Sequence, residues 1–252
     1  MSSETFPQSA RRRASGVWAF RARAEAVAAG RFLQLARDLE TVAAPAVVID
    51  LAARASEEEQ RHIDHCRDLV EWLGADPGES PVVPHFELPK QLLDRERTVL
   101  LQVVGTSCIN ETVSATVLSE MMRCAERGPV HDTIQLILKD EINHGRFGWA
   151  YLAHLSQKGS LDYVGPYLPM LLDAAIEDEL FDTPDPDDPD EPTIALGTLP
   201  KIKRAALFRE AIEELVLPAL QHFGVDTRLG ESWIRSKRSV APEGIESPLT
   251  RS

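Results

Sequence analysis

The chain has 252 residues, a formal net charge of −13 and 43% hydrophobic residues. Its length allows one sizeable core, or one core with an appendage, and its acidic excess argues against a nucleic-acid partner. Ala, Leu, Glu and Arg are frequent, and no long run of alternating β-branched residues occurs. We therefore expect an all-α fold.

Hydrophobic periodicity predicts four long helices after a flexible N-terminal arm at residues 1–17. The helices are expected at 18–42, 46–73, 90–126 and 130–158. Short links containing Pro45 or Gly128-Pro129 join the first helix to the second and the third to the fourth, so each pair should be antiparallel. Residues 18–158 should thus form a four-helix bundle.

The link between the second and third helices, residues 74–89, is longer and rich in Gly and Pro. Its sixteen residues, fully extended, reach roughly 53–58 Å. A helix of 28 residues is only roughly 42 Å long. The link is therefore expected to cross the whole bundle and return the third helix to the starting end.

The signals weaken after residue 158. We expect a C-terminal helical extension over residues 159–227, with a helix at 160–181 interrupted near Pro166 and Pro169. An acidic, Pro-rich run at 182–193 should be a solvated loop. A helix at 200–223, bent or shortened by Pro218, should lie against the bundle. Residues 228–252 are expected to form a flexible tail.

Targeting and redox signals are few. The three cysteines lack Cys-x-x-Cys spacing and indicate reduced thiols in a cytoplasmic protein. Cys66 and Cys108 each fall one turn from a candidate site residue, and we interpret them as small core residues. Arginines at residues 11–13 resemble the start of an export signal, but no apolar region completes it. No apolar run approaches roughly eighteen residues, so we expect no membrane partner.

One pattern occurs twice: a lone Glu on one predicted helix, then Glu-x-x-His on the next. The residues are Glu25, Glu59 and His62 in the first copy, and Glu111, Glu141 and His144 in the second. The lone Glu precedes its motif by 34 residues in one copy and by 30 in the other. A single Glu-x-x-His is weak evidence, because surface charges produce many. The doubled pattern predicts a two-metal carboxylate site.

The spacing has a physical reason. Residues i and i+3 lie on the same face of a helix, so the Glu and His of each motif can point at one ion. All six residues fall on the apolar stripe of their own helix, which argues against solvated helix faces. No stripe provides a Lys or Arg to compensate the buried charges, so we expect metal ions to do so. Carboxylates with one imidazole per metal suit iron or manganese, and zinc remains possible.

The order Glu, Glu-x-x-His, Glu, Glu-x-x-His across residues 20–158 resembles the ferritin-like superfamily of di-metal carboxylate proteins. The resemblance implies two Fe or Mn ions per chain, held by the six residues above. Either Glu59 with Glu111, or Glu25 with Glu141, would shift between bridging and terminal positions. By the same resemblance, Asp140 would hold His62 and Glu58 would hold His144, with surface charges as the alternative for both acids.

Several subfamilies are a poor fit. The chain has no spacing for a four-Cys iron domain. It continues well past residue 158, whereas storage ferritins end soon after the bundle. It has Cys66, not Tyr, one turn after the first His, and Ile137 where arylamine oxygenases have a His. We expect an oxidoreductase that activates dioxygen or peroxide on a small-molecule substrate, with an electron donor, as a monomer or homodimer. An iron-oxidising or sequestering protein, or a metal-binding stress protein without turnover, is the alternative.

Overall fold

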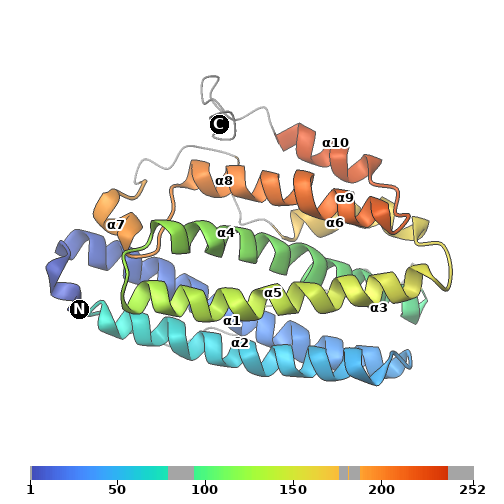
Figure 1. Ribbon diagram of the computed structural model, residues 1–252, viewed down its shortest axis with the longest axis horizontal. Helices are drawn as coiled ribbons and strands as arrows, with labels where there is room; N and C mark the ends of the chain where they lie inside the picture. The colour runs from blue at the N-terminus through green and yellow to red at the C-terminus, as the bar shows by residue number, and fades with distance from the viewer. Residues whose placement is uncertain (1, 79–93, 176–180, 182–187, 238–252) are drawn as a thin grey trace.

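The computed structural model describes residues 2–78, 94–175, 181 and 188–237, and within these ranges every regular element is helical (Figure 1). The all-α prediction is confirmed. The α-helices are α1 (Gln8–Thr41), α2 (Ala46–Trp72), α3 (Arg95–Val103), α4 (Glu111–Cys124), α5 (Pro129–Ser156), α6 (Leu168–Asp173), α7 (Glu191–Ala195), α8 (Lys201–Glu210), α9 (Leu217–His222) and α10 (Arg228–Ser236). Short 3₁₀ helices are η1 (Ser3–Thr5) and η3 (Asp162–Tyr167), and π-helices are η2 (Val104–Asn110) and η4 (Ala211–Val216).

Helices α1 and α2 form an antiparallel pair along one side of the molecule (Figure 1). α1 ends where Ala43 adopts a left-handed φ of 49° and the Ala44 N–H donates to the Leu39 carbonyl at 3.1 Å. This turn provides N–H donors for the last carbonyls of the helix. Pro45 is the N-cap residue of α2, which follows immediately. Farther along, the Ser56 hydroxyl donates to the Ala29 carbonyl at 2.8 Å. The predicted pairing of these two helices is therefore confirmed.

The third predicted helix is a continuous helical run, α3–η2–α4, that contains a π-helical segment. Its first predicted residues, 90–93, lie outside the described residues. Gly128, at φ 145°, turns the chain into α5, whose first residue is Pro129. Proline suits this position because the first N–H of a helix has no intrahelical partner.

The C-terminal end of α2 lies near the start of α1, whereas the N-terminal end of α3 lies near the end of α1. Leu73, just after α2, packs in one apolar cluster with Ala10 and Ala14 near the start of α1. Arg95, the first residue of α3, contacts Asp38 at 2.5 Å near the end of α1. The expected crossover connects these two points, and most of it lies outside the described residues.

The C-terminal elements lie against the side of the bundle formed by α4 (Figure 1). The predicted helix at 200–223 is present as α8–η4–α9. Pro218 follows the π segment, in which the Leu217 N–H bonds to the Ile212 carbonyl. Because proline has no N–H to donate, the widened turn before it accommodates the break. The helix expected at 160–181 is replaced by η3 and the short α6, and residues 176–180 lie outside the described part.

Two expected flexible segments are helical where they are described. α1 begins at Gln8, so the flexible arm at 1–17 is wrong for residues 8–17. Ala10 and Ala14 continue the buried stripe that leads to Trp18. The tail from 228 is wrong for α10, whose Ile234 is buried and whose Trp233 indole N–H donates to Asp173 at 2.8 Å. In both segments a few small or apolar residues pack against partners that are distant in sequence.

The acidic, Pro-rich run at 182–193 is also more ordered at its end than expected. Asp190 caps α7 by accepting from the Thr193 N–H at 3.1 Å, and Thr193 is only 1% exposed. Asp188 holds the start of α8 through the Lys201 N–H at 2.9 Å. The first residues of the run, 182–187, lie outside the described residues. The acids nearest α7 and α8 therefore act as helix caps, which a compositional argument does not reveal.

In the described part of the chain, the core consists of two apolar clusters along the bundle. One gathers Phe32, Leu39 and their neighbours toward the end of α1, and the other gathers Trp18, Leu69 and their neighbours toward its start. The candidate site residues lie between the two clusters. Among the described helices, none combines the length and low charge needed to cross a membrane.

Helix α5 approaches η2 closely at Gly148, where there is little room for a larger side chain. A Cβ at this position would lie 2.5 Å from the Ser107 Oγ and 3.1 Å from the Cys108 Sγ. Gly148→Ala should destabilise the protein by about 1–3 kcal/mol through overpacking, partly offset by the higher helix propensity of Ala. Urea unfolding measures the difference.

Gly16→Ala is the matched control, because a Cβ on that exposed residue of α1 would meet nothing within 4 Å. It should be neutral or stabilising. Equal unfolding free energies for Gly148→Ala and Gly16→Ala would contradict the close contact between α5 and η2.

Candidate metal centre

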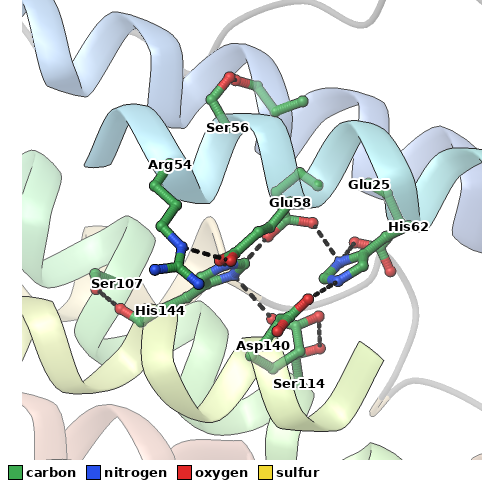
Figure 2. Close-up of polar contacts among 12 residues, drawn as sticks. Glu25, Arg54, Ser56, Glu58, His62, Ser107, Ser114, Asp140 and His144 are labelled. Atoms are coloured by element: carbon green, nitrogen blue, oxygen red, sulfur yellow. Dashed lines mark hydrogen bonds and ion pairs between the residues drawn. The ribbon is translucent and has the colours of Figure 1, made fainter. Parts of the chain in front are cut away.

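The six residues singled out by the doubled motif come together in the structure, and Figure 2 shows three of them, Glu25, His62 and His144. They form two overlapping groups, and within each group one donor atom from every residue lies within 4.8 Å of the others. One group is Glu25, Glu59, His62 and Glu141, and the other is Glu59, Glu111, Glu141 and His144. Each of the six is at most 5% exposed. The sequence prediction that these residues lie together is therefore confirmed.

Two carboxylates, Glu59 and Glu141, belong to both groups. Each comes from a Glu-x-x-His motif, on α2 or α5. The expected bridging pairs were Glu59 with Glu111 or Glu25 with Glu141, so the shared residues include one member of each pair. Glu25 and Glu111 each serve one group only. This difference arises because α2 and α5 face each other across the site, which the spacing within one helix does not reveal.

The two histidines are oriented alike. The Nδ1 of His62 lies 3.1 Å from Glu59, and the Nδ1 of His144 lies 3.0 Å from the other oxygen of the same carboxylate. The opposite ring nitrogens point outward, where His62 Nε2 lies 3.3 Å from Asp140 and His144 Nε2 lies 2.9 Å from Glu58 (Figure 2). An Nε2–H donated to these acids would leave both Nδ1 lone pairs facing the carboxylates.

The predicted contacts of Asp140 and Glu58 are therefore both present, each from the helix opposite its histidine. The side chain of Asp140 is 23% exposed, whereas Glu58 is buried and pairs with Arg54 at 2.8 Å and Arg61 at 3.5 Å. Burial alone would raise the pKa of Glu58, but the hydrogen bonds from Arg54 and His144 lower it below its ordinary value. Both acids are available as acceptors for an imidazole N–H.

The π-helix η2 lies immediately before Glu111 and packs against α5. The hydroxyl of Ser107, in the middle of η2, donates to the His144 carbonyl. A π segment rotates the residues that follow it relative to a regular α-helix, so it changes the direction in which Glu111 leaves the helix. The hydrophobic pattern of residues 90–126 predicts a helix and does not predict this extra residue in the turn.

Arg21 is a residue of this cluster that the sequence interpretation missed. We expected no Lys or Arg among the buried acids, and the structure contradicts this. The Arg21 Nε lies 2.8 Å from Glu25, and its Nη2 lies 3.2 Å from Glu141 and donates to Ser114 at 3.0 Å. Arg21 precedes Glu25 by four residues, one helical turn, and this spacing is the signal that would have found it.

The pKa values of Glu25 and Glu111 shift in the opposite direction to that of Glu59. Burial, with repulsion from Glu59 and Glu141, raises the pKa of Glu25 well above its ordinary value despite the attraction of Arg21. Burial, followed by repulsion from Glu141, does the same to the pKa of Glu111. Burial opposes ionisation of Glu59 too, but its contacts with His144 and His62 lower its pKa below the ordinary value. Without metal, the site is therefore expected to hold protons on Glu25 and Glu111.

His144 behaves as the partner of Glu59. Burial lowers its pKa, but the contacts with Glu59, Glu141 and Glu58 outweigh burial and raise the pKa to about 9. In the described part of the chain, the Arg21 guanidinium and one protonated imidazole thus lie in contact with the cluster of four carboxyl groups. Protons and metal ions are alternative ways to compensate the remaining charge.

The residues present fit metal ions. Buried Glu25 Oε1, Glu59 Oε1, Glu141 Oε2 and His144 Nδ1 lack a well-directed hydrogen bond. Their neighbours are ionic contacts such as Arg21 with Glu25 and His144 with Glu59, so these atoms keep lone pairs that a metal ion could use. Carboxylate oxygens with one imidazole nitrogen per group form a donor set that can hold a divalent metal ion.

The cysteines take no part in either group of donors. Cys66, one turn after His62, is fully buried in the apolar cluster that contains Trp18. Burial, followed by repulsion from Glu25, raises the pKa of the Cys66 thiol well above its ordinary value. Burial also raises the pKa of Cys108. The interpretation of both as small core residues is confirmed.

Comparison of the chain with protein-family models, curated proteins and solved structures finds no match. Any functional conclusion therefore rests on the residues and their geometry. The strongest geometric feature is the pair of donor groups that share Glu59 and Glu141.

The raised pKa values predict how the stability of the metal-free protein changes with pH. A group with a higher pKa in the folded state stabilises the fold below its unfolded pKa, and this stabilisation is lost as pH rises through the folded value. For His144 the loss should run from pH 6.5 to about 9. The raised pKa values of Glu25 and Glu111 act in the same direction, because their ionised forms are disfavoured in the folded state.

The melting temperature of the metal-free protein should therefore fall over this pH interval. Scanning calorimetry of chelator-treated protein measures it, and a His144→Gln variant should give a smaller pH dependence. A melting temperature that rises with pH would contradict the electrostatic description of the site.

Proposed function

We propose that this chain is a ferritin-like di-metal carboxylate protein that binds two iron or manganese ions and acts as an oxidoreductase on dioxygen or peroxide. The observation that carries the proposal is the convergence of both Glu-x-x-His motifs on two donor groups with Glu59 and Glu141 in common. Each group contains three carboxylates and one imidazole.

The arrangement of the helices supports the ferritin-like part of the proposal. The six donors come in sequence order from α1, α2, α4 and α5. The end of α2 and the start of α3 lie near opposite ends of α1, which agrees with a bundle that has one long crossover between α2 and α3. The two motif helices, α2 and α5, contact each other directly at the site.

The protein would hold each ion through the inner nitrogen of one histidine and through carboxylate oxygens. Glu58 and Asp140 would accept the outer N–H of His144 and His62, which fixes the tautomer and aims the free nitrogen at the ion. Two such ions, when bound, supply Lewis acidity and electrons for reduction of dioxygen or peroxide. The ring of Phe32 lies 5.3 Å from that of His144 and excludes water from this side.

The elements after residue 158 favour an enzyme over an iron store. Helices α8 and η4 pack against α4, the helix that begins with Glu111, and so cover one side of the bundle. A covered bundle suits a small assembly and a single buried site. An iron-sequestering shell is the alternative that metal loading distinguishes.

Metal content provides the main test. Purified protein loaded anaerobically with Fe²⁺ and passed through a desalting column should retain close to two ions per chain, measured by elemental analysis. The double variant Glu59→Ala, Glu141→Ala should lose most of the binding, because both residues serve both groups. Glu57→Ala is the matched control, since Glu57 is an exposed neighbour on α2.

Unchanged metal content in the double variant would refute the assignment. Loading in air should also stop near two irons per chain, on a monomer or dimer in size-exclusion chromatography. A large cage that takes up hundreds of irons would favour the storage function over the oxidoreductase.

Asp140 provides a second test of the same site. Asp140→Ala removes the acceptor for the His62 Nε2–H and should weaken metal affinity by roughly 10–100-fold, with helix content unchanged in circular dichroism. Asp132→Ala is the control, because Asp132 lies on the same helix and its side chain is 75% exposed. Equal affinities for the two variants, measured by competition with a chromophoric chelator, would show that Asp140 does not support the ligand.

A further inference from the structure

The two halves of the candidate site differ in their contacts with an arginine. On the Glu25 side, Arg21 contacts Glu25 and the shared Glu141, and it also bonds Ser114, which donates to Glu141 at 3.0 Å. Its side chain is 16% exposed, so it lies at the edge of the buried layer. The guanidinium thus neutralises part of the charge that Glu25 and Glu141 would offer to an ion, and Glu25 belongs to this group alone.

The Glu111 side has no equivalent among the described residues. The residue four positions before Glu111, where Arg21 stands relative to Glu25, is the neutral Ser107. Ser107 donates to the His144 carbonyl and not to a carboxylate. Arg31 is the cation whose charge acts on Glu111, but within the described residues these two side chains form no ion pair. The near two-fold symmetry of the ligands is therefore broken in charge.

A fixed cation beside one donor group has two effects on an incoming divalent ion. It repels the ion directly, and it occupies oxygens of Glu25 and Glu141 that the ion would need. The ion must displace Arg21 from these oxygens or share them with it. Arg21 Nε and Glu25 Oε1 lie 2.8 Å apart without a well-directed hydrogen bond, whereas Arg21 Nη2 donates to Glu141 Oε1 at 3.2 Å. An ion that takes the Glu25 oxygen therefore breaks no directed bond, whereas an ion that takes Glu141 Oε1 competes with the bond from Arg21.

We infer that Arg21 makes the two metal positions unequal: the position formed by Glu111 and His144 binds first, and the position formed by Glu25 and His62 binds second and more weakly. This inference rests on the proposed two-metal function. It also gives Arg21 a role in the metal-free protein, where the guanidinium takes the place of the second ion's charge.

Manganese titration tests the inference. Free Mn²⁺ is read by electron paramagnetic resonance while the full-length protein is titrated, which yields the two binding constants without any assay of activity. The wild-type protein should bind two ions with separated constants. Arg21→Gln should tighten the weaker constant by more than about tenfold, equivalent to about 1.4 kcal/mol, and leave the stronger one less affected. Arg21→Lys, which keeps the charge, should retain most of the separation.

Histidine variants identify the position that Arg21 controls. His144→Gln should leave one weak ion, and adding Arg21→Gln to it should tighten that ion. His62→Gln should leave one tight ion, and adding Arg21→Gln should change it less. Arg23→Gln is the control for net charge, because Arg23 lies on the same helix and its guanidinium stacks on Phe20.

The outcomes separate the inference from the proposed function. Two bound ions whose constants do not respond to Arg21→Gln, or respond equally to Arg23→Gln, would overturn the role of Arg21 and leave the two-metal function intact. A wild-type protein that binds no Mn²⁺ and no Fe²⁺ would overturn both. If Arg21→Gln fails to fold, Arg21→Lys and the two histidine variants still decide the order of the positions.

Discussion

The mutual repulsion of four buried carboxyl groups is the interaction on which the centre of this structure depends. Glu25, Glu59, Glu111 and Glu141 come from four different helices and meet where almost no water reaches them. Such a cluster persists only with compensating positive charge. The structure supplies the guanidinium of Arg21 and the imidazoles. The raised pKa values of two carboxyl groups also allow protons to neutralise them. The compensation is partial, and the unused donor atoms agree with two metal ions.

The doubled motif predicted the ligand set because its information is local. A Glu and a His three residues apart share a helix face whatever the rest of the fold does, and the apolar residues around them indicate that this face is buried. The bounds of α2 and α5 followed from the same periodicity and from Pro45 and Gly128-Pro129. The contacts of Asp140 and Glu58 came from the resemblance to ferritin-like proteins and are present in the structure.

What the sequence did not predict depends on contacts between distant segments. Arg21 lies on a polar-looking stretch, and its burial is set by Glu141 and Ser114 on other helices. The π segment before Glu111 changes the helical register and packs against Gly148 of α5, and hydrophobic periodicity encodes neither feature. Helix α10 was interpreted as a tail because its docking uses Gly230 and Ile234, a short apolar pattern in a polar sequence. Only the fold connects such sparse features to their partners.

The charged layer divides the apolar core into two clusters, and this division has a consequence for how the protein opens. A layer of carboxyl groups contributes little hydrophobic stabilisation, so in the metal-free state the two ends of the bundle are joined mainly by the continuity of α1, α2, α5 and the run α3–η2–α4. Local opening should then require less free energy at this layer than within either cluster. Ions held by four helices would join the two clusters into one cooperative unit, so metal would govern the cooperativity of folding as well as its free energy.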